Sequence, residues 1–155
     1  MVVMELDNNG LEVLSRSESL ALLAMTTVAR VGVTVDALPV VLPVNFAFDG
    51  NQIVLRSAPG TKLTAALANA VIAFEADAVN PMDHSGWSVL VQGMSRVLTD
   101  PKEIEAAERL PLRPWANEGA DQFIVIDVNR VSGRRLNQWD RASLLPHHPR
   151  STPVA

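Results

Sequence analysis

Apolar side chains recur at two different spacings along the chain, and the change of spacing predicts a change from helix to strand. Residues 14–25 place their leucines on one side of a helix. Ser15 and Glu18 have the spacing of a capping box at the start of this helix. In residues 26–35 the apolar positions become β-branched valines, which favour a strand.

A second strand and its return strand follow around a tight turn. Leu38–Phe48 is rich in valine and phenylalanine. Its Pro39 and Pro43 cannot donate hydrogen bonds to a neighbouring strand, so they predict an edge or an irregular stretch. Asp49-Gly50-Asn51 is typical of a hairpin turn, with glycine available for a positive φ, and residues 52–57 form the return strand.

The rest of the chain continues as short elements joined by turns. They are a helix from Lys62 to about Asn69 that begins after Thr61, a strand over residues 71–76, a polar loop over 77–86, a long strand over 87–98, a helix from Pro101 to about Leu110 with Asp100 as its N-cap, and a strand over 123–128. Because hairpins dominate and no strand–helix–strand rhythm appears, the pattern favours a mainly β fold, an antiparallel barrel or sandwich with short helices.

Composition narrows the class of protein. The 155 residues are the length of one domain, and a chain that is 48% hydrophobic and 19% charged is not disordered throughout. The chain contains no cysteine, which excludes disulfide scaffolds, cysteine nucleophiles and iron–sulfur clusters. Its net charge of −4 is opposite in sign to that of proteins that coat duplex nucleic acid, so no nucleic-acid partner is expected.

The two ends of the chain bear on its organisation and location. Residues 1–142 are expected to form a single domain, and residues 143–155, which contain several prolines and two histidines, a mobile tail. Residues 1–10 lack the basic start and apolar core of a signal peptide. The apolar run over 28–48 is interrupted by charged residues and prolines, so it does not fit a membrane helix. We therefore expect a cytoplasmic protein without a membrane partner.

The strongest candidate for chemistry is the segment Arg56-Ser57-Ala58-Pro59-Gly60-Thr61-Lys62-Leu63. A strand ends in arginine and serine, a glycine-containing loop follows, and a helix begins with threonine and lysine. Hydroxyl groups, two cationic side chains and the amides of a helix start are the groups that hold a phosphate monoester. The spacing is not that of a Walker loop. An ordinary capped turn with solvated charges would have the same residues.

Two strands carry further candidates. Asn45 is the only strongly polar side chain in residues 40–48, so it is either a ligand contact or an outward residue on an edge strand. Farther along, strand alternation places Trp87 and Ser88 on opposite faces. The polar face that includes Ser88 would suit contact with a heterocycle, whereas Trp87 would equally suit a core or interface position.

Other groups of reactive side chains are weaker candidates. His84, His147 and His148 lie in a loop and in the tail without the spacing of metal ligands, so no metal site is expected. Glu75 and Asp77 share one face of a strand. That arrangement is more typical of a solvated or dimer-facing side than of an acid–base pair.

The ordered set of segments resembles a known family. The segments are residues 15–23, Ala29-Arg30-Val31, Leu42-Pro43-Val44-Asn45-Phe46, residues 56–63, residues 71–77, and residues 86–93 with Arg96-Val97. Over residues 14–136 they resemble the pyridoxamine 5′-phosphate oxidase-like proteins, the FMN-binding split-barrel family, and in particular its actinobacterial branch. The resemblance implies a six-stranded antiparallel split β-barrel that forms a homodimer with its cofactor sites at the subunit interface.

The resemblance also implies which residues bind the cofactor, FMN. These residues are Val44, Asn45, Arg56, Ser57, Thr61, Lys62, Leu63, Trp87, Ser88 and Arg134. Those of the glycine-containing loop would hold the phosphate, and those of the strands would lie along the ring system and the ribityl chain. Arg134, which is otherwise a surface charge, would reach across from the other subunit.

The true oxidases of this family differ from the chain at one strand. They carry an Arg-x-x-Leu-x-Lys strand for the flavin phosphate, where this chain reads Pro39-Val40-Val41-Leu42-Pro43-Val44 without Arg or Lys. The resemblance therefore implies FMN-dependent oxidation or reduction of a small organic substrate other than vitamin B6, with no catalytic residue named. A deazaflavin-dependent reductase of the same fold, and a module that binds a flavin or another planar ligand without turnover, stay as alternatives.

Overall fold

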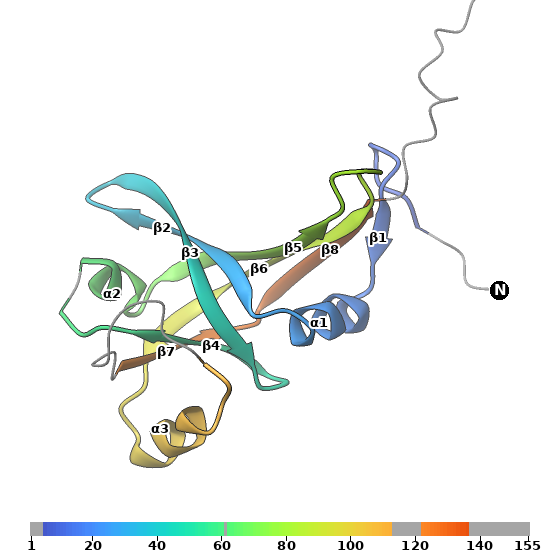
Figure 1. The fold of residues 1–155 in the computed structure, drawn as a ribbon. Helices are drawn as coiled ribbons and strands as arrows, with labels where there is room; N and C mark the ends of the chain where they lie inside the picture. Colours follow the sequence, from blue (N-terminus) through green and yellow to red (C-terminus); the bar gives the residue numbers. More distant parts are fainter. Residues whose placement is uncertain (1–4, 61, 113–121, 137–155) are drawn as a thin grey trace, which may run out of the picture.

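The computed structural model describes residues 5–60, 62–112 and 122–136 (Figure 1). Within these residues it contains eight strands and three helices. The strands are β1 (Glu12–Leu14), β2 (Val28–Val35), β3 (Leu38–Phe48), β4 (Gln52–Ser57), β5 (Val71–Val79), β6 (Gly86–Val97), β7 (Gln122–Asp127) and β8 (Arg130–Leu136). The helices are α1 (Arg16–Ala24), α2 (Lys62–Leu67) and α3 (Pro101–Glu108).

Six of the strands close into an antiparallel barrel. The strands follow the order β1-β8-β6-β5-β2-β3-β4-β7, and β7 also pairs with β6. This second pairing closes the ring β6-β5-β2-β3-β4-β7, while β8 and β1 extend the sheet outward from β6. The predicted fold class, a mainly β chain forming a six-stranded antiparallel split barrel with short helices, is confirmed.

Two long strands change partner partway along, and this opens the barrel into two arms. Residues 86–92 of β6 pair with β8, whereas residues 95–97 pair with β7. Gly93 lies at the change, where a Cβ atom would overlap the carbonyl oxygen of Asp127. In the same way β3 pairs with β2 over residues 38–45 and with β4 over residues 46–48. The β2–β3 arm and the β5–β6–β8 arm diverge from these points (Figure 1).

The predicted helix starts and the predicted hairpin turn are confirmed. At α1 the Ser15 hydroxyl accepts from the amide of Glu18, and the Glu18 carboxylate accepts from the amide of Ser15. At α3 the Asp100 carboxylate accepts from the amide of Lys102, with proline in the first turn. Gly50 has a φ of 100° in the turn between β3 and β4.

The main core fills the interior of the barrel with buried side chains from all six of its strands, and it determines which side chains remain outside. Phe46 and Phe74 meet edge to face at its centre, with ring centroids 4.8 Å apart. On β6, Val89 and Val91 are fully buried while Leu90 is exposed. We call the opposite side of the β3–β2–β5–β6–β8 sheet the outer face. Its side chains include Val28, Arg30, Gly32, Val41, Asn45, Ala73, Glu75, Asp77, Ser88, Leu90, Gln92, Ser132 and Arg134.

Two expectations about the elements are corrected by the structure, and a third is not tested by it. β5 continues to Val79 and β6 begins at Gly86, so the polar loop comprises residues 80–85 rather than 77–86. The strands β1 and β8 were not predicted, because β8 contains three arginines and no apolar run. Residues 137–155, which include the predicted tail, lie outside the described residues.

None of the helices in the described ranges is long and apolar enough to cross a membrane.

Candidate functional site

Arg56 and Ser57 are the last two residues of β4, and Lys62 is the first residue of α2. We call the region from the end of β4 to the first turn of α2 the connection between β4 and α2. β4 pairs with β7, which places Arg56 opposite Phe123 and Ser57 opposite Gln122. The guanidinium carbon of Arg56 lies 5.7 Å from the centroid of the Phe123 ring, within the range of a cation–π contact. Pairing with β7 therefore fixes the position of the end of β4 and of the Arg56 and Ser57 side chains there. Of the other residues predicted here, Thr61 and the side chain of Leu63 lie outside the described residues.

The Ser57 hydroxyl contacts helix α2 through Thr64. The two hydroxyl oxygens are 2.8 Å apart, and Thr64 Oγ1 donates to the Ala58 carbonyl at 2.8 Å. Thr64 is only 5% exposed, so it is anchored beneath the connection. It was not among the predicted site residues. Its signal in the sequence is a second hydroxyl within the first turn of a short helix, which is too common a pattern to single out.

Lys62 forms an exposed ion pair with the tip of the β2–β3 hairpin. Its Nζ lies 3.2 Å from Oδ2 of Asp36, and the two side chains are 84% and 75% exposed. Asp36 and Ala37 both have positive φ, as the central residues of a tight hairpin turn do. Water screens a pair this exposed, and such pairs contribute about 0–1 kcal/mol. Lys62 can therefore exchange Asp36 for another anion at small cost.

The predicted strand residues divide between the outer face and the core. Asn45 and Ser88 lie on the outer face, with Asn45 opposite Val28 and Ser88 opposite Arg134. Their chain neighbours Val44 and Trp87 are half-buried against the main core instead.

The start of β6 and the connection between β4 and α2 lie at opposite ends of the molecule (Figure 1). In a single chain the predicted residues are therefore spread over the connection, the outer face and the edge of the main core.

Arg134 is held within its own chain by the segment before β1. Its Nε donates to Oδ2 of Asp7 at 2.8 Å, and its Nη1 donates to the Gly133 carbonyl at 2.9 Å. The other carboxylate oxygen of Asp7 accepts from the amides of Asn9 and Leu11. The hydrogen bond from Arg134 and these amides together lower the pKa of Asp7. The predicted reach of Arg134 toward a second subunit stays a prediction, and it would require release of this contact.

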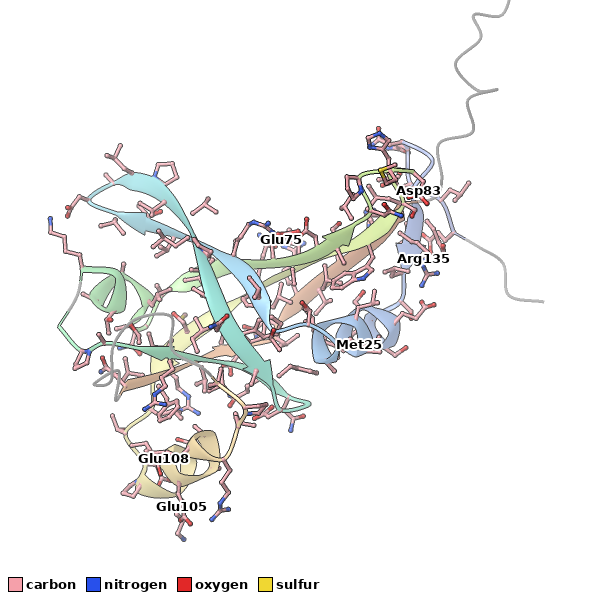
Figure 2. All side chains as sticks on the ribbon, viewed as in Figure 1. Met25, Glu75, Asp83, Glu105, Glu108 and Arg135 are labelled. Carbon is pink, nitrogen blue, oxygen red and sulfur yellow. The ribbon has the colours of Figure 1, made fainter. Side chains whose placement is uncertain are left out.

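The outer face also carries a charged cluster that joins two strands. Nη1 of Arg30 on β2 lies 2.7 Å from Oδ1 of Asp77 and 3.3 Å from Oε2 of Glu75, both on β5. Figure 2 shows Glu75 on the side of the sheet away from α1. Burial and the charge of Asp77 raise the pKa of Glu75, and Arg30 only partly offsets them. The two carboxylates share a face as predicted, but their arginine partner follows only from the β2–β5 register.

Two hollows adjoin these residues. One, of about 260 Å³, lies on the outer face and is lined by Arg30, Gly32, Val41, Ala73 and Glu75. It exists because glycine and alanine are paired across β2 and β5 and leave a depression between bulkier neighbours. It combines an apolar floor with a guanidinium group and a carboxyl group at its rim.

The second hollow, of about 320 Å³, contains the predicted residue Asn45. It is lined by Thr27, Asn45, Phe46 and Pro111. A side-chain amide beside an aromatic residue can orient a planar polar ligand by hydrogen bonding.

Among the residues that the structure describes, no group of three or more histidine, aspartate or glutamate side chains is placed to hold a metal ion. His147 and His148 lie outside those residues.

Comparisons with known proteins identify relatives along most of the chain. A family model described as pyridoxamine 5′-phosphate oxidase matches residues 15–135. The uncharacterized protein Rv0080 of Mycobacterium tuberculosis is 34% identical over 128 residues, which cover 79% of this chain and 84% of that relative.

Solved structures with the same fold include two from related bacteria. An FAD binding protein from Mycobacterium smegmatis is 32% identical, with a TM-score of 0.68 over 79% of this chain and 95% of that one. A conserved protein of unknown function from Corynebacterium diphtheriae is 31% identical, with a TM-score of 0.68 over 82% of this chain and 98% of that one. All three relatives come from actinobacteria, the branch that the sequence segments resemble.

Proposed function

The chain belongs to the pyridoxamine 5′-phosphate oxidase family, and from this premise we propose that it binds a flavin nucleotide and uses it to oxidise or reduce a small organic substrate. FMN is the first candidate, because the connection between β4 and α2 carries groups suited to a phosphate monoester. FAD is the second, because the relative from Mycobacterium smegmatis is named for FAD binding.

The donor set at the end of β4 carries this proposal. Arg56 and Lys62 supply positive charge, and both are exposed to solvent. Ser57, which lies between them in the sequence, is half-buried and adds a hydroxyl group. Charge-assisted hydrogen bonds from such groups are the usual means of holding a phosphate. The residues present therefore fit the phosphate end of a flavin nucleotide.

The remaining predicted residues would orient the ligand rather than react with it. A bound flavin supplies two-electron oxidation–reduction chemistry, while the protein supplies position and electrostatics. In this proposal Lys62 exchanges Asp36 for the phosphate, and the Asn45 amide hydrogen-bonds the polar part of the ligand in its hollow. No side chain is assigned the role of a general acid or base.

We further propose that two copies associate through the outer face, as cytoplasmic homodimers. Large apolar side chains are exposed on it although they would be buried in a dimer; they are Val28, Val41, Val71, Leu90 and Met94. A second copy would also bring predicted residues of the connection and of the outer face, which lie apart in one chain, within reach of one ligand. The hollow beside Glu75 lies on this same face.

The experiment that tests flavin binding begins with the purified protein. We expect a yellow preparation with absorbance near about 450 nm, and FMN or FAD identified in it by mass spectrometry. A colourless protein stabilised by a deazaflavin but not by FMN or FAD would contradict the flavin assignment and favour the deazaflavin reductase. A bound flavin that no nicotinamide donor or candidate substrate reduces or oxidises would favour a binding module without turnover.

The dimer is tested by one substitution on the outer face. Leu90→Glu places a charge at the centre of the proposed interface, so we expect the mass in light scattering to fall from that of two chains to that of one. Met82→Glu, in the exposed loop between β5 and β6, is the matched control and should leave the mass unchanged. A Leu90→Glu protein that keeps the mass of two chains would rule out this face.

A further inference from the structure

Two hydrogen-bonded hydroxyl groups, those of Ser57 and Thr64, lie at the connection between β4 and α2, and we call this pair the relay. Thr64 donates its hydroxyl proton to the Ala58 carbonyl, since a carbonyl oxygen can only accept. A hydroxyl has one proton, so Thr64 has none left for its 2.8 Å contact with Ser57. Ser57 must therefore be the donor in that contact. Its proton points inward, toward the helix.

The direction of this relay limits what Ser57 can offer to a ligand. With its proton committed to Thr64, the outward side of Ser57 Oγ carries lone pairs only. A phosphate dianion carries acceptors only, and two acceptors do not form a hydrogen bond. As found, Ser57 matches a ligand group that brings its own proton, such as a hydroxyl. It matches a dianionic phosphate only after the relay reverses.

We propose that Thr64 is a positioning residue that controls the direction in which the Ser57 hydroxyl donates, and so sets the affinity of this connection for a phosphate group. The proposal rests on the flavin-nucleotide function proposed above. In the reversed relay the Thr64 hydroxyl rotates from the Ala58 carbonyl to Ser57 Oγ, and the Ser57 hydroxyl rotates outward to the phosphate. Each oxygen keeps its own proton, and no covalent bond forms or breaks.

Thr64 opposes the reversal because the Ala58 carbonyl loses its hydrogen bond. Ser57 does not compensate for this loss, since its own oxygen lies 3.5 Å from that carbonyl, at the limit of hydrogen bonding. Phosphate binding through Ser57 is therefore weaker than the same contact would be without Thr64.

The test compares the affinities for FMN and riboflavin, which differ by the phosphate alone. In the unmodified protein we expect FMN to bind more tightly. Thr64→Val keeps the side-chain shape but removes the hydroxyl, so Ser57 can donate outward without that loss. We expect the ratio of FMN affinity to riboflavin affinity to rise about three- to tenfold, the size of one hydrogen bond. Thr64→Ser, which retains the hydroxyl, should leave this ratio within about twofold.

The Ser57→Ala background separates a relay from a general effect on packing. In that background Thr64→Val should no longer change the FMN to riboflavin ratio, because the outward donor is gone. Thr99→Val, at an exposed threonine before α3, is the control for loss of a hydroxyl elsewhere. Circular dichroism checks that each variant is folded. If Thr64→Val is not folded, Thr64→Ala, which also removes the hydroxyl, takes its place with the same expected rise in the ratio.

Different results would overturn different parts of the argument. Equal affinities of the unmodified protein for FMN and riboflavin would overturn the phosphate site and the relay with it. A preference for FMN that Thr64→Val leaves unchanged or lowers would overturn the relay alone. A rise in the ratio that persists in the Ser57→Ala background, or that Thr64→Ser also produces, would likewise overturn it.

Discussion

The β4–α2 connection and the outer face both place a cation beside carboxylates, but they hold it in different ways. At the connection Lys62 meets a single carboxylate, Asp36, and the two side chains are 84% and 75% exposed. On the outer face Arg30 meets two carboxylates, Glu75 and Asp77, which are each 34% exposed. The hydrogen bond and charge of Asp77, followed by those of Glu75, raise the pKa of Arg30.

The difference separates a cation that can take a ligand from one that cannot. An exposed single pair is screened by water and exchanges its anion easily. An arginine that already has two carboxylates at hydrogen-bond distance gains little from a third anion, and removing it would leave two like charges together. We therefore expect anion binding at the connection and packing at the outer face.

Gly93 has the largest expected effect, because the sheet that forms the outer face and the sheet that carries β4 join there. In Gly93→Ala the new Cβ would overlap the carbonyl of Asp127, so β6 and β7 must separate. We expect a loss of at least about 3 kcal/mol of unfolding free energy, measured by urea denaturation. Gly32→Ala is the matched control: its Cβ would meet only Ala73 at 3.5 Å, and we expect a change within about 1 kcal/mol. Similar losses in the two variants would show that the junction is not tightly packed.

Replacing Lys62 tests the proposed anion-binding region directly. Lys62→Ala should weaken FMN binding by about 1.5–3 kcal/mol, the scale of a charge-assisted hydrogen bond. The chain offers a well-matched control, since Lys102 on α3 is the one other lysine in the sequence and is also exposed. Lys102→Ala should leave the dissociation constant from fluorescence titration unchanged. If both variants bind FMN as the unmodified protein does, Lys62 is not part of the site.

Arg30 tests the outer face, with a smaller expected effect. Arg30→Gln leaves Glu75 and Asp77 without their counter-charge, so we expect a small loss of stability near neutral pH, measured by urea denaturation. Glu75→Gln in the same chain should restore most of it.

The pH dependence follows from the raised pKa of Glu75. Where folding raises the pKa of a carboxyl group, the unfolding free energy of the protein falls as the pH rises through that pKa. The reason is that the folded state disfavours the charged form of the group. The deficit of Arg30→Gln should therefore shrink as the pH falls from 7 toward the ordinary glutamate value of 4.5. A deficit in urea denaturation that is constant over this range would show that Arg30 acts through packing instead.

Local patterns predicted most of the fold, and the missing parts depend on contacts far along the chain. The β3 strand, the Gly50 turn and the Ser15 and Asp100 caps each depend on a few neighbouring residues, and sequence alone located them. β8 was missed because it has three arginines and no apolar run, and it becomes a strand by pairing with β6 on one side and β1 on the other. Neither pairing leaves a local signal.

The candidate site divides in the same way. Arg56, Ser57 and Lys62 stand within seven residues of one another, so the sequence sufficed to group them. Arg30 and Glu75 are 45 positions apart, and only the β2–β5 register brings them together. The sequence also could not show that Arg134 is committed to Asp7, a contact that spans 127 positions.

The two prolines of β3 have a consequence for how copies of the chain meet. The amide of Phe46 donates to Thr27, so alternate amides along β3 face β2, and the nitrogens of Pro39 and Pro43 fall on the opposite edge. In the described part of the chain, no strand pairs with that edge over residues 38–45. An open edge normally invites another chain to add a strand and so begin a fibril, but this one lacks two of the donors that such growth needs. The two missing donors therefore make this edge a poor template for the addition of a further strand.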